Sequence, residues 1–221
     1  MNPYWLTTAE QVCRFAKQMD HIGLTAGTSG NISACVPNEA YAVITPSGMA
    51  YEGLQAEDMV VIDFDGRQVS GIHRASSETP LHAHLYAMHS SVQAIVHTHS
   101  LYATAFSVLR KPIPFVSLEG LGVNAPSVEV ADYQLPGTPE LAVSAVEAFK
   151  RYSGANAILL PNHGLVCIGQ SLSEAFSLAV NVEREANIYA IACSIGTPVL
   201  LSASKLQQIK ANYSGFPSKT L

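Results

Sequence analysis

The chain has 221 residues, of which 48% are hydrophobic and 13% charged, and its formal net charge is -5. A chain of this length and composition can bury a large core, so one domain over residues 1–221 is predicted. The 12 Lys and Arg residues are scattered, which argues against a nucleic-acid partner. No apolar run approaches the roughly 18 residues that cross a bilayer. The first residues lack a basic segment before an apolar one, so we expect a cytoplasmic protein without a membrane partner.

The first half of the chain predicts two helices, two strands and a hairpin. The pattern Thr7-x-x-Glu10 is typical of a capping box at a helix start. The dipeptide Asp65-Gly66 favours a tight turn between two strands. In chain order the expected elements are a helix over 8–22, strands over 32–36 and 42–45, a hairpin over 59–69 and a helix from about 78 to 89.

The second half alternates strands and helices. Thr138-Pro139 marks a helix start, because proline is tolerated in the first turn. The expected strands cover 94–99, 113–117, 157–162 and 165–169, and the expected helices cover 101–109, 138–152, 171–194 and 204–213. This order predicts an α/β fold in which helices cover a mixed sheet.

Two histidines stand on one face of a predicted buried strand, in the stretch AIVHTHS. Residues i and i+2 of a strand share a face, so His97 and His99 point the same way. His163, in a turn between two strands, could supply a third imidazole for a catalytic zinc, at Zn–N distances of roughly 2.0–2.1 Å. A single strand histidine is more often a hydrogen-bonded core residue. The pair favours metal, because burying two imidazoles without a partner is costly.

Glu78 is the acidic residue of interest, although a carboxylate at a helix start can simply complement the helix dipole. His82, His84 and His89 lie on the helix that follows it. They are expected to pack or to hydrogen-bond rather than to bind metal. His82 lies four residues after Glu78 and is the one expected to support a metal ligand.

Three loops at 27–31, 45–48 and 76–77 are rich in glycine and small hydroxyl residues. Backbone N–H groups in such turns can converge on a phosphate. Each loop alone is explained by ordinary turn chemistry. Together with the histidines they predict an anion site that needs few lysines.

The ordered motifs GTSGNIS, ITPSGMAY, SSETPLH, AIVHTHSLYATA, YQLPGT and NHG closely resemble the class II aldolase/adducin family. The resemblance extends from about Gly27 into the long helix after Ser171. It implies a three-layer α/β/α class II aldolase-like fold with a central mixed, largely antiparallel sheet. It also implies a homotetramer with active sites between neighbouring subunits.

By position, the resemblance implies that His97, His99 and His163 bind Zn²⁺, with Mn²⁺ or Co²⁺ as alternatives, and that Glu78 is the catalytic acid/base. The implied phosphate site comprises Thr28, Gly30, Asn31, Ser47, Gly48, Ser76 and Ser77. Tyrosine is the usual proton donor of family aldolases, but its place here is Leu118. Tyr213 is a candidate replacement, although a tyrosine near a terminus often only packs.

The activity implied is zinc-dependent cleavage of a ketose 1-phosphate of the fuculose or ribulose type, through a metal-stabilised enediolate, to dihydroxyacetone phosphate and an aldehyde. Alternatives on the same scaffold are a sugar-acid phosphate decarboxylase, a methylthioribulose-1-phosphate dehydratase and a pentulose-phosphate 4-epimerase. Glu78 stands where the epimerases have Asp, which argues against epimerisation. The intact histidines argue against a non-catalytic adducin-like module.

Overall fold

The computed structural model describes residues 3–213, in which nine strands form one sheet in the order β4-β3-β2-β1-β5-β9-β8-β7-β6. The strands are β1 (Asn31–Cys35), β2 (Tyr41–Ile44), β3 (Val60–Asp63), β4 (Gln68–Ser70), β5 (Ala94–Thr98), β6 (Ile113–Pro114), β7 (Ser127–Val130), β8 (Ala157–Leu160) and β9 (Gly164–Gly169). Neighbouring strands are antiparallel except β7 and β8, which are parallel. The predicted mixed, largely antiparallel sheet is therefore confirmed.

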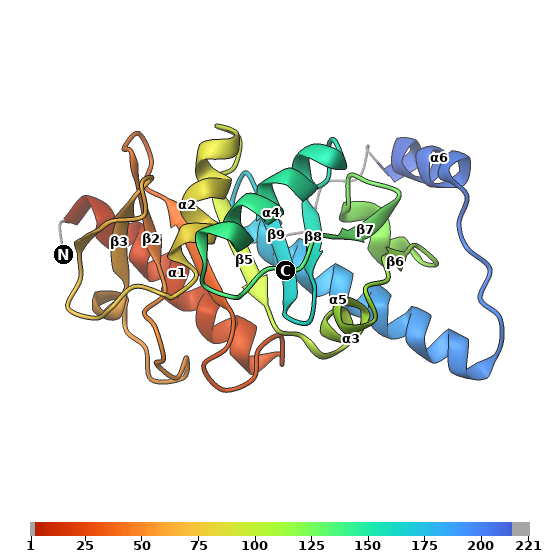
Figure 1. Cartoon of the computed structure of the whole chain (residues 1–221), viewed down its shortest axis with the longest axis horizontal. Coiled ribbons are helices and arrows are strands. Elements are labelled where there is room, and N and C mark those ends of the chain that lie inside the picture. Colours follow the sequence, from red (N-terminus) through yellow and green to blue (C-terminus); the bar gives the residue numbers. More distant parts are fainter. Residues whose placement is uncertain (1–2, 214–221) are drawn as a thin grey trace.

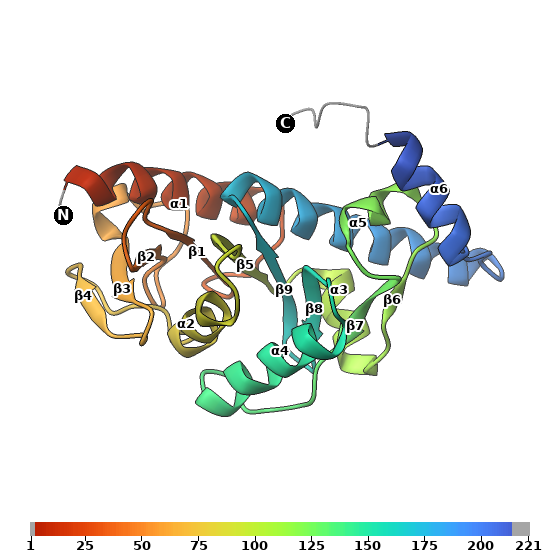
Figure 2. The same cartoon turned by 90° about the horizontal axis from the view of Figure 1, so that it is seen from above.

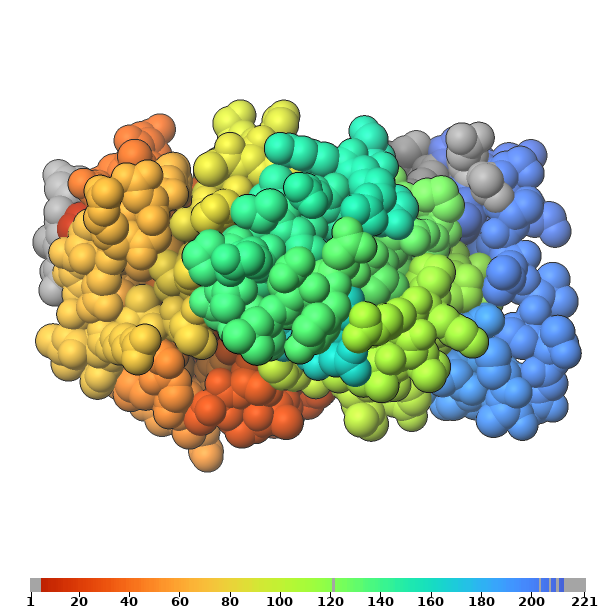
Figure 3. All heavy atoms as spheres, viewed as in Figure 1, coloured from red at the N-terminus to blue at the C-terminus, as the bar shows by residue number. Residues whose placement is uncertain are grey.

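Helices cover both faces of this sheet. They are α1 (Pro3–His21), α2 (Thr79–Met88), α3 (Leu101–Leu109), α4 (Pro139–Arg151), α5 (Leu172–Ile195) and α6 (Ala203–Tyr213), with short 3₁₀ helices η1 (Ala56–Asp58) and η2 (Leu118–Gly122). Figures 1 and 2 show α1 and α5 on one face and α2 and α4 on the other. In the space-filling view of Figure 3, α2 and α4 lie side by side on the second face.

Two apolar cores result, one on each side of the sheet. The first joins α1, α3 and α5 to the sheet through residues such as Val12, Phe106 and Ala179. The second joins α2 and α4 to the opposite face through residues such as Leu85 and Leu141. Because β5 and β9 lie in the middle of the sheet, both of their faces are buried, which explains their nearly continuous apolar sequence.

The predicted start of the first helix is wrong. The helix α1 begins at Pro3, so Thr7 and Glu10 lie inside it and form no capping box. Tertiary contacts stabilise the extra turn, since Trp5 packs against the first core and its Nε1–H donates to Glu39 at 2.7 Å. Proline near the first helical position is compatible with this earlier start.

The strand predicted over 113–117 is also wrong in length. It ends at Pro114, and the backbone N–H groups of Val116 and Ser117 donate to the carboxylate of Glu185 instead of to a strand. The sequence pattern does not predict the short strand β7. A four-residue strand gives too few alternations for a reliable pattern.

The other elements agree with the predictions within a few residues, and α3 agrees at both ends. The four cysteines are free: Cys13 and Cys167 are buried, Cys35 is partly buried and Cys193 is exposed. Over the described residues, no helix combines the length and the apolar character that a bilayer span requires.

Candidate active site

The central strand β5 ends at the histidine pair. His97 is fully buried, and its Nδ1–H donates to the Leu165 carbonyl of β9 at 3.0 Å. This bond fixes the ring orientation and leaves the Nε2 lone pair free for a ligand. The Nε2 of His99, one residue beyond the strand, lies 3.0 Å from the Nε2 of His97.

The turn between β8 and β9 supplies the third imidazole. Its Asn162 adopts a left-handed conformation with φ of 55°, which reverses the chain just before His163. The Nε2 of His163 lies 3.3 Å from that of His97. One nitrogen from each of the three rings lies within 4.8 Å of the others. The predicted convergence of these side chains is thus present in the structure.

The spacing of the imidazole nitrogens suits ligands of one divalent metal ion. Tetrahedral ligands at Zn–N distances near 2.05 Å stand about 3.3 Å apart, close to the 3.0 and 3.3 Å from the His97 Nε2 to those of His99 and His163. Burial lowers the pKa of His163 to about 4, with a smaller contribution from His99. Burial, followed by the neighbouring imidazoles, also lowers the pKa of His97. The rings are therefore neutral near pH 7, which is the form that binds metal.

Two glycines let the backbone approach these rings. A Cβ on Gly30 would lie 2.7 Å from the His97 carbonyl oxygen, and its φ of +74° also disfavours other residues. A Cβ on Gly164 would lie 2.1 Å from the Thr98 carbonyl oxygen. The close packing of β1, β5 and β9 around the histidines therefore requires residues without side chains at both positions.

Glu78 lies at the N-terminal end of α2 with an unusual environment for a carboxylate. It is 7% exposed, and its Oε2 is buried without a hydrogen-bond partner. Burial raises its pKa to about 6, and the backbone N–H of Gly137 partly opposes this shift. Its oxygens do not belong to the group of converging imidazole nitrogens. The Glu78 carboxyl, with this raised pKa, can take up and release a proton near neutral pH.

The three glycine- and hydroxyl-rich loops meet at one end of the sheet. Thr45 exchanges hydrogen bonds with Ile32, since its N–H donates to the Ile32 carbonyl and its Oγ1 accepts from the Ile32 N–H. The N–H of Ser76 donates to the Thr45 carbonyl at 3.2 Å. The N–H of Ser47 donates to the Arg74 carbonyl at 2.9 Å. The segments at 30–32, 45–47 and 74–76 are consequently neighbours, as the predicted anion site requires.

The cluster of three histidines lies beside these loops, because Asn31 pairs directly with His97 across β1 and β5. Thr28, Gly48 and Ser77 lie at exposed positions in the same three loops. The carbonyl of Ser77 faces Gly137, 3.4 Å from where a Cβ on that glycine would stand. A cluster of imidazoles, an acid and N–H-rich loops in this arrangement can bind a metal and an anionic substrate together.

The family model described as "Class II Aldolase and Adducin N-terminal domain" matches residues 10–190. The chain is 34% identical to the 5-deoxy-D-ribulose 1-phosphate aldolase of Bacillus thuringiensis, covering 94% of this chain and 95% of that protein. It is 32% identical to the 5-methylthioribulose-1-phosphate/5-deoxyribulose-1-phosphate aldolase of Rhodospirillum rubrum, covering 91% and 88%. A solved L-fuculose 1-phosphate aldolase superposes with a TM-score of 0.87 at 33% identity, covering 94% and 96%.

The chain belongs to the class II aldolase/adducin family. The expected fold is confirmed with it, and so is the expectation of a class II aldolase enzyme.

In this class II aldolase, His82 has a different partner from the one predicted. The sequence predicts that it supports a metal ligand, but its ring contacts Asn31 at 2.5 Å and Ser33 at 2.6 Å. The sequence could not indicate this, because the contact depends on how α2 packs against β1. His82 therefore supports a residue of the predicted phosphate site.

Two acidic residues of α5 that hold the site in place are absent from the sequence predictions. Glu183 accepts from the N–H groups of Tyr102 and Ala103, at 2.8 and 2.9 Å, and so caps the helix that follows His99. Glu185 is fully buried and accepts from Val116 and Ser117. A charged residue on the apolar stripe of α5 is the signal that could have identified Glu185.

The place of the family tyrosine is well defined in the structure. Leu118, at that place in the chain, begins η2 and is 48% exposed. Tyr213 is the last residue of α6, and its side chain lies outside the described part of the structure. Its role as a proton donor stays a prediction.

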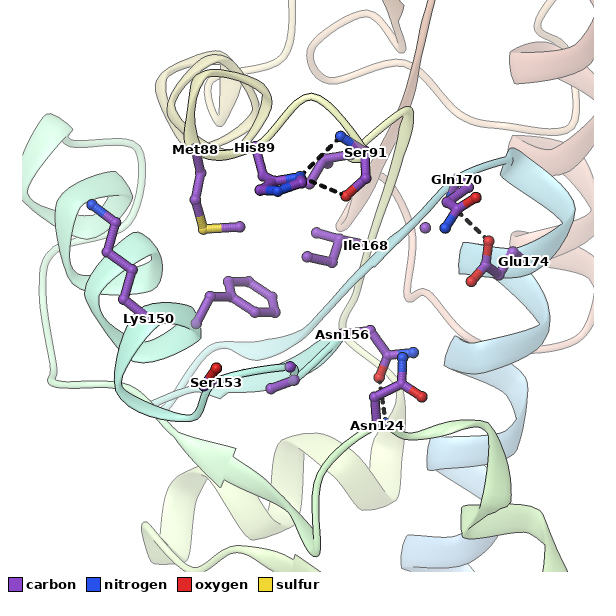
Figure 4. Close-up of a pocket in the computed structure, with 15 residues that line it drawn as sticks. Met88, His89, Ser91, Asn124, Lys150, Ser153, Asn156, Ile168, Gln170 and Glu174 are labelled. Atoms are coloured by element: carbon purple, nitrogen blue, oxygen red, sulfur yellow. Dashed lines mark hydrogen bonds between the residues drawn. The ribbon is translucent and has the colours of Figure 1, made fainter. Parts of the chain in front are cut away.

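A separate groove of about 550 Å³ lies at the ends of β5, β8 and β9 that are remote from the three clustered histidines. Figure 4 shows that some of its polar side chains bond locally: the His89 ring contacts the Ser91 hydroxyl, and the Asn156 Oδ1 accepts from the Asn124 backbone N–H. This groove therefore takes no part in the candidate active site.

Proposed function

We propose that the protein is a metal-dependent aldolase that cleaves a ketose 1-phosphate of the fuculose or ribulose type into dihydroxyacetone phosphate and an aldehyde. The observation that carries this proposal is the convergence of three imidazoles, with His97 and His163 buried and His99 partly buried, beside loops rich in backbone N–H groups, one of which leads into the buried acid Glu78. The names of the relatives support it, since they are aldolases of 5-deoxyribulose, 5-methylthioribulose and fuculose phosphates.

In this proposal His97, His99 and His163 are the metal ligands, and Zn²⁺ is the metal, with Mn²⁺ or Co²⁺ as alternatives. Three neutral imidazoles leave an open coordination position, as catalytic zinc sites do. The bound ion supplies a Lewis acid that polarises the substrate carbonyl and stabilises negative charge on oxygen. The Leu165 carbonyl holds the His97 ring in the tautomer that coordination needs.

The phosphate is assigned to the three loops. Its proposed contacts are Thr28, Gly30, Asn31, Ser47, Gly48, Ser76 and Ser77. Hydroxyl, amide and backbone N–H donors of this kind bind phosphate without a lysine cluster. This agrees with the scattered basic residues and the net charge of -5.

Glu78 is assigned the proton transfer at carbon. When the C3–C4 bond of the ketose breaks, its electron pair stays on C3, and the Glu78 carboxyl donates a proton there. In the condensation direction the carboxylate removes that proton. The C4 hydroxyl must lose its proton as the aldehyde forms, and Tyr213 is the proposed acceptor. A pKa near 6 suits a group that serves in both directions at neutral pH.

We further propose a cytoplasmic homotetramer with active sites at the subunit boundaries. Exposed apolar side chains around the site, such as Leu101, Leu109 and Leu135, support assembly. Light scattering coupled to size exclusion measures the mass directly. A monomer that retains full turnover would contradict this part.

The function is tested with purified, zinc-loaded protein and three substrates: 5-deoxyribulose 1-phosphate, 5-methylthioribulose 1-phosphate and fuculose 1-phosphate. We expect dihydroxyacetone phosphate from at least one of them, measured by coupled reduction with NADH, and loss of the signal after chelation. Release of carbon dioxide from a 3-oxo sugar-acid phosphate, loss of water from methylthioribulose phosphate or epimerisation without cleavage would each identify a rival reaction. Absence of both metal and turnover would indicate an adducin-like module.

A further inference from the structure

Four buried polar side chains form a continuous chain between α2 and β1. The Tyr86 hydroxyl lies 2.5 Å from the Ser33 Oγ, which lies 2.6 Å from the His82 Nδ1. The His82 Nε2 lies 2.5 Å from the Asn31 Oδ1. All four side chains are buried, and His82 and Ser33 are completely so.

The chemistry of these groups gives the chain one direction. Burial lowers the pKa of His82 to about 3, so the ring is neutral and has one N–H. The Asn31 Oδ1 can only accept, so the His82 Nε2 donates to it. The bare Nδ1 must then accept from the Ser33 hydroxyl, and the Ser33 Oγ in turn accepts from the Tyr86 hydroxyl.

The orientation of the Asn31 amide, from which this direction follows, also decides which of its groups is left for the substrate. The carbonyl oxygen is held toward α2 by His82. The hydrogen bond of this side chain within residues 3–213 is made through Oδ1, and the Nδ2 group, which is not among the buried unpaired atoms, remains available as a donor of two N–H groups. Asn31 follows Gly30 at the start of β1 and pairs with His97, so it stands between the proposed phosphate loops and the proposed metal ligands. A flipped amide would present an oxygen lone pair to the anion and repel it.

We propose that His82 is a positioning residue which, kept in its Nε2–H tautomer by Ser33 and Tyr86, holds the Asn31 amide with its NH₂ group toward the substrate phosphate. This inference rests on the proposed function, because the phosphate role of Asn31 is part of that proposal. His82 itself touches no reacting atom. Its effect is the orientation of a donor, and a wrong tautomer would reverse that orientation.

The tautomer can be measured directly on wild-type, zinc-loaded enzyme. Nitrogen-15 NMR of histidine-labelled protein distinguishes a protonated Nε2 from a protonated Nδ1, and the resonance missing in His82→Gln identifies His82. We expect the Nε2–H tautomer, neutral at pH 5. A protonated Nδ1, or a ring that is charged at pH 5, would overturn the inference.

Ser33→Ala tests the consequence for binding. It removes the donor to His82 and frees the tautomer, so we expect the Kd for inorganic phosphate and the KM for the ketose phosphate to rise about tenfold, the equivalent of one hydrogen bond. The turnover number should change less than twofold, and the metal content should stay the same. Ser144→Ala is the matched control, because it also removes one buried serine hydroxyl, bonded to the Asp132 carbonyl.

The outcomes separate this inference from the proposed function. Unchanged phosphate affinity in Ser33→Ala, or an equal loss in Ser144→Ala, would show that the chain only packs. If Ser33→Ala weakens phosphate binding while the wild type turns over no ketose phosphate, the positioning role stands and the proposed function fails. A fall in turnover number with an unchanged KM would also count against the inference.

Discussion

Two buried glutamates, Glu78 on α2 and Glu185 on α5, illustrate two uses of the same side chain. Glu185 is fully buried, and its carboxylate accepts from the Val116 and Ser117 N–H groups and from the Ser117 hydroxyl. Glu78 is nearly as buried, but its Oε2 has no partner, and burial raises its pKa to about 6. The number of hydrogen bonds made by each buried acid therefore separates an acid that holds a loop from an acid available for chemistry.

Other buried polar groups of the molecule differ in the same way. Near Glu185, the α5 residue Glu183 also has both oxygens bonded to backbone N–H groups. In the histidine cluster, the Nδ1 of His163 is buried without a partner, and the Nε2 atoms of His99 and His163 both face that of His97. Unpaired buried polar groups are costly. Among the described residues, two of the four such atoms belong to residues of the candidate site, Glu78 and His163, and the other two belong to Thr104 on α3 and Asn187 on α5.

The largest effect is expected when one of the imidazoles is removed. His99→Ala leaves two neutral nitrogens, too few to hold a divalent ion tightly, so we expect metal content near zero and turnover at background. Metal analysis of dialysed protein and the cleavage assay measure this. His84→Ala is the control, because His84 is an exposed histidine on α2 whose ring bonds the Pro80 carbonyl of the same helix. Full zinc content in His99→Ala would mean that the ligands are misassigned.

Glu78→Gln should keep the metal and lose the chemistry. An amide of the same shape cannot transfer the proton at carbon, so kcat should fall by about 10²–10⁴-fold. The melting temperature should not fall, because the substitution removes an unpaired buried charge. Calorimetry and steady-state kinetics on the same sample check both parts. Wild-type turnover in this variant would refute the assigned role.

Glu185→Gln makes the same substitution at a carboxylate whose two oxygens both accept hydrogen bonds. In contrast to Glu78→Gln, it should lower the stability of the protein. Weaker hydrogen bonds to Val116 and Ser117 should lower the free energy of unfolding by about 3 kcal/mol, since bonds to a charged acceptor are worth about 1.5–3 kcal/mol each. The metal content of the folded protein should stay as in wild type. Chemical denaturation measures the loss. Equal stability of the two Gln variants would remove the distinction between the acids.

The smallest effect is the pH dependence contributed by Glu78. Its pKa is about 6 in the folded protein against an ordinary 4.5, so the folded state binds the proton more tightly. Its contribution to stability is therefore fully present below pH 4.5 and is lost as the pH rises through 6, by about 2 kcal/mol. Subtracting the stability profile of metal-free Glu78→Gln from that of metal-free wild type isolates this slope. A flat difference would show that the carboxyl is not perturbed.

The rate of the condensation reaction should follow the ionisation of the Glu78 carboxyl. It requires the Glu78 carboxylate, so its rate should rise as the pH passes through about 6. The rate of dihydroxyacetone phosphate consumption against pH, with an aldehyde at fixed concentration, measures this. A rate that falls across the same range would assign the base to another group.

The features that the sequence could predict are those that depend on local spacing. The i, i+2 relation placed His97 and His99 on one face, and the short connection between β8 and β9 pointed to His163 as the third ring. The helix starts at Thr138 and Ser171 were also correct, because both side chains cap the helix that follows.

The features that it could not predict depend on contacts between distant segments. The pairing of Asn31 with His97 is a matter of strand register across β1 and β5. The bonds of Glu185 to the segment after β6 join residues nearly seventy positions apart in the chain. The early start of α1 depends on the packing of Trp5. None of these leaves a periodic pattern in a single sequence.

Gly164 has a consequence for how this protein can change over generations. A side-chain carbon there would lie 2.1 Å from the Thr98 carbonyl oxygen and 3.4 Å from the His97 ring, and would force β9 away from β5. A library randomised at this codon and screened for metal binding and aldolase turnover should therefore return glycine alone. A residue without any functional group would then be strictly required at the proposed metal site, because a side chain at this position would separate the strands that hold the histidines.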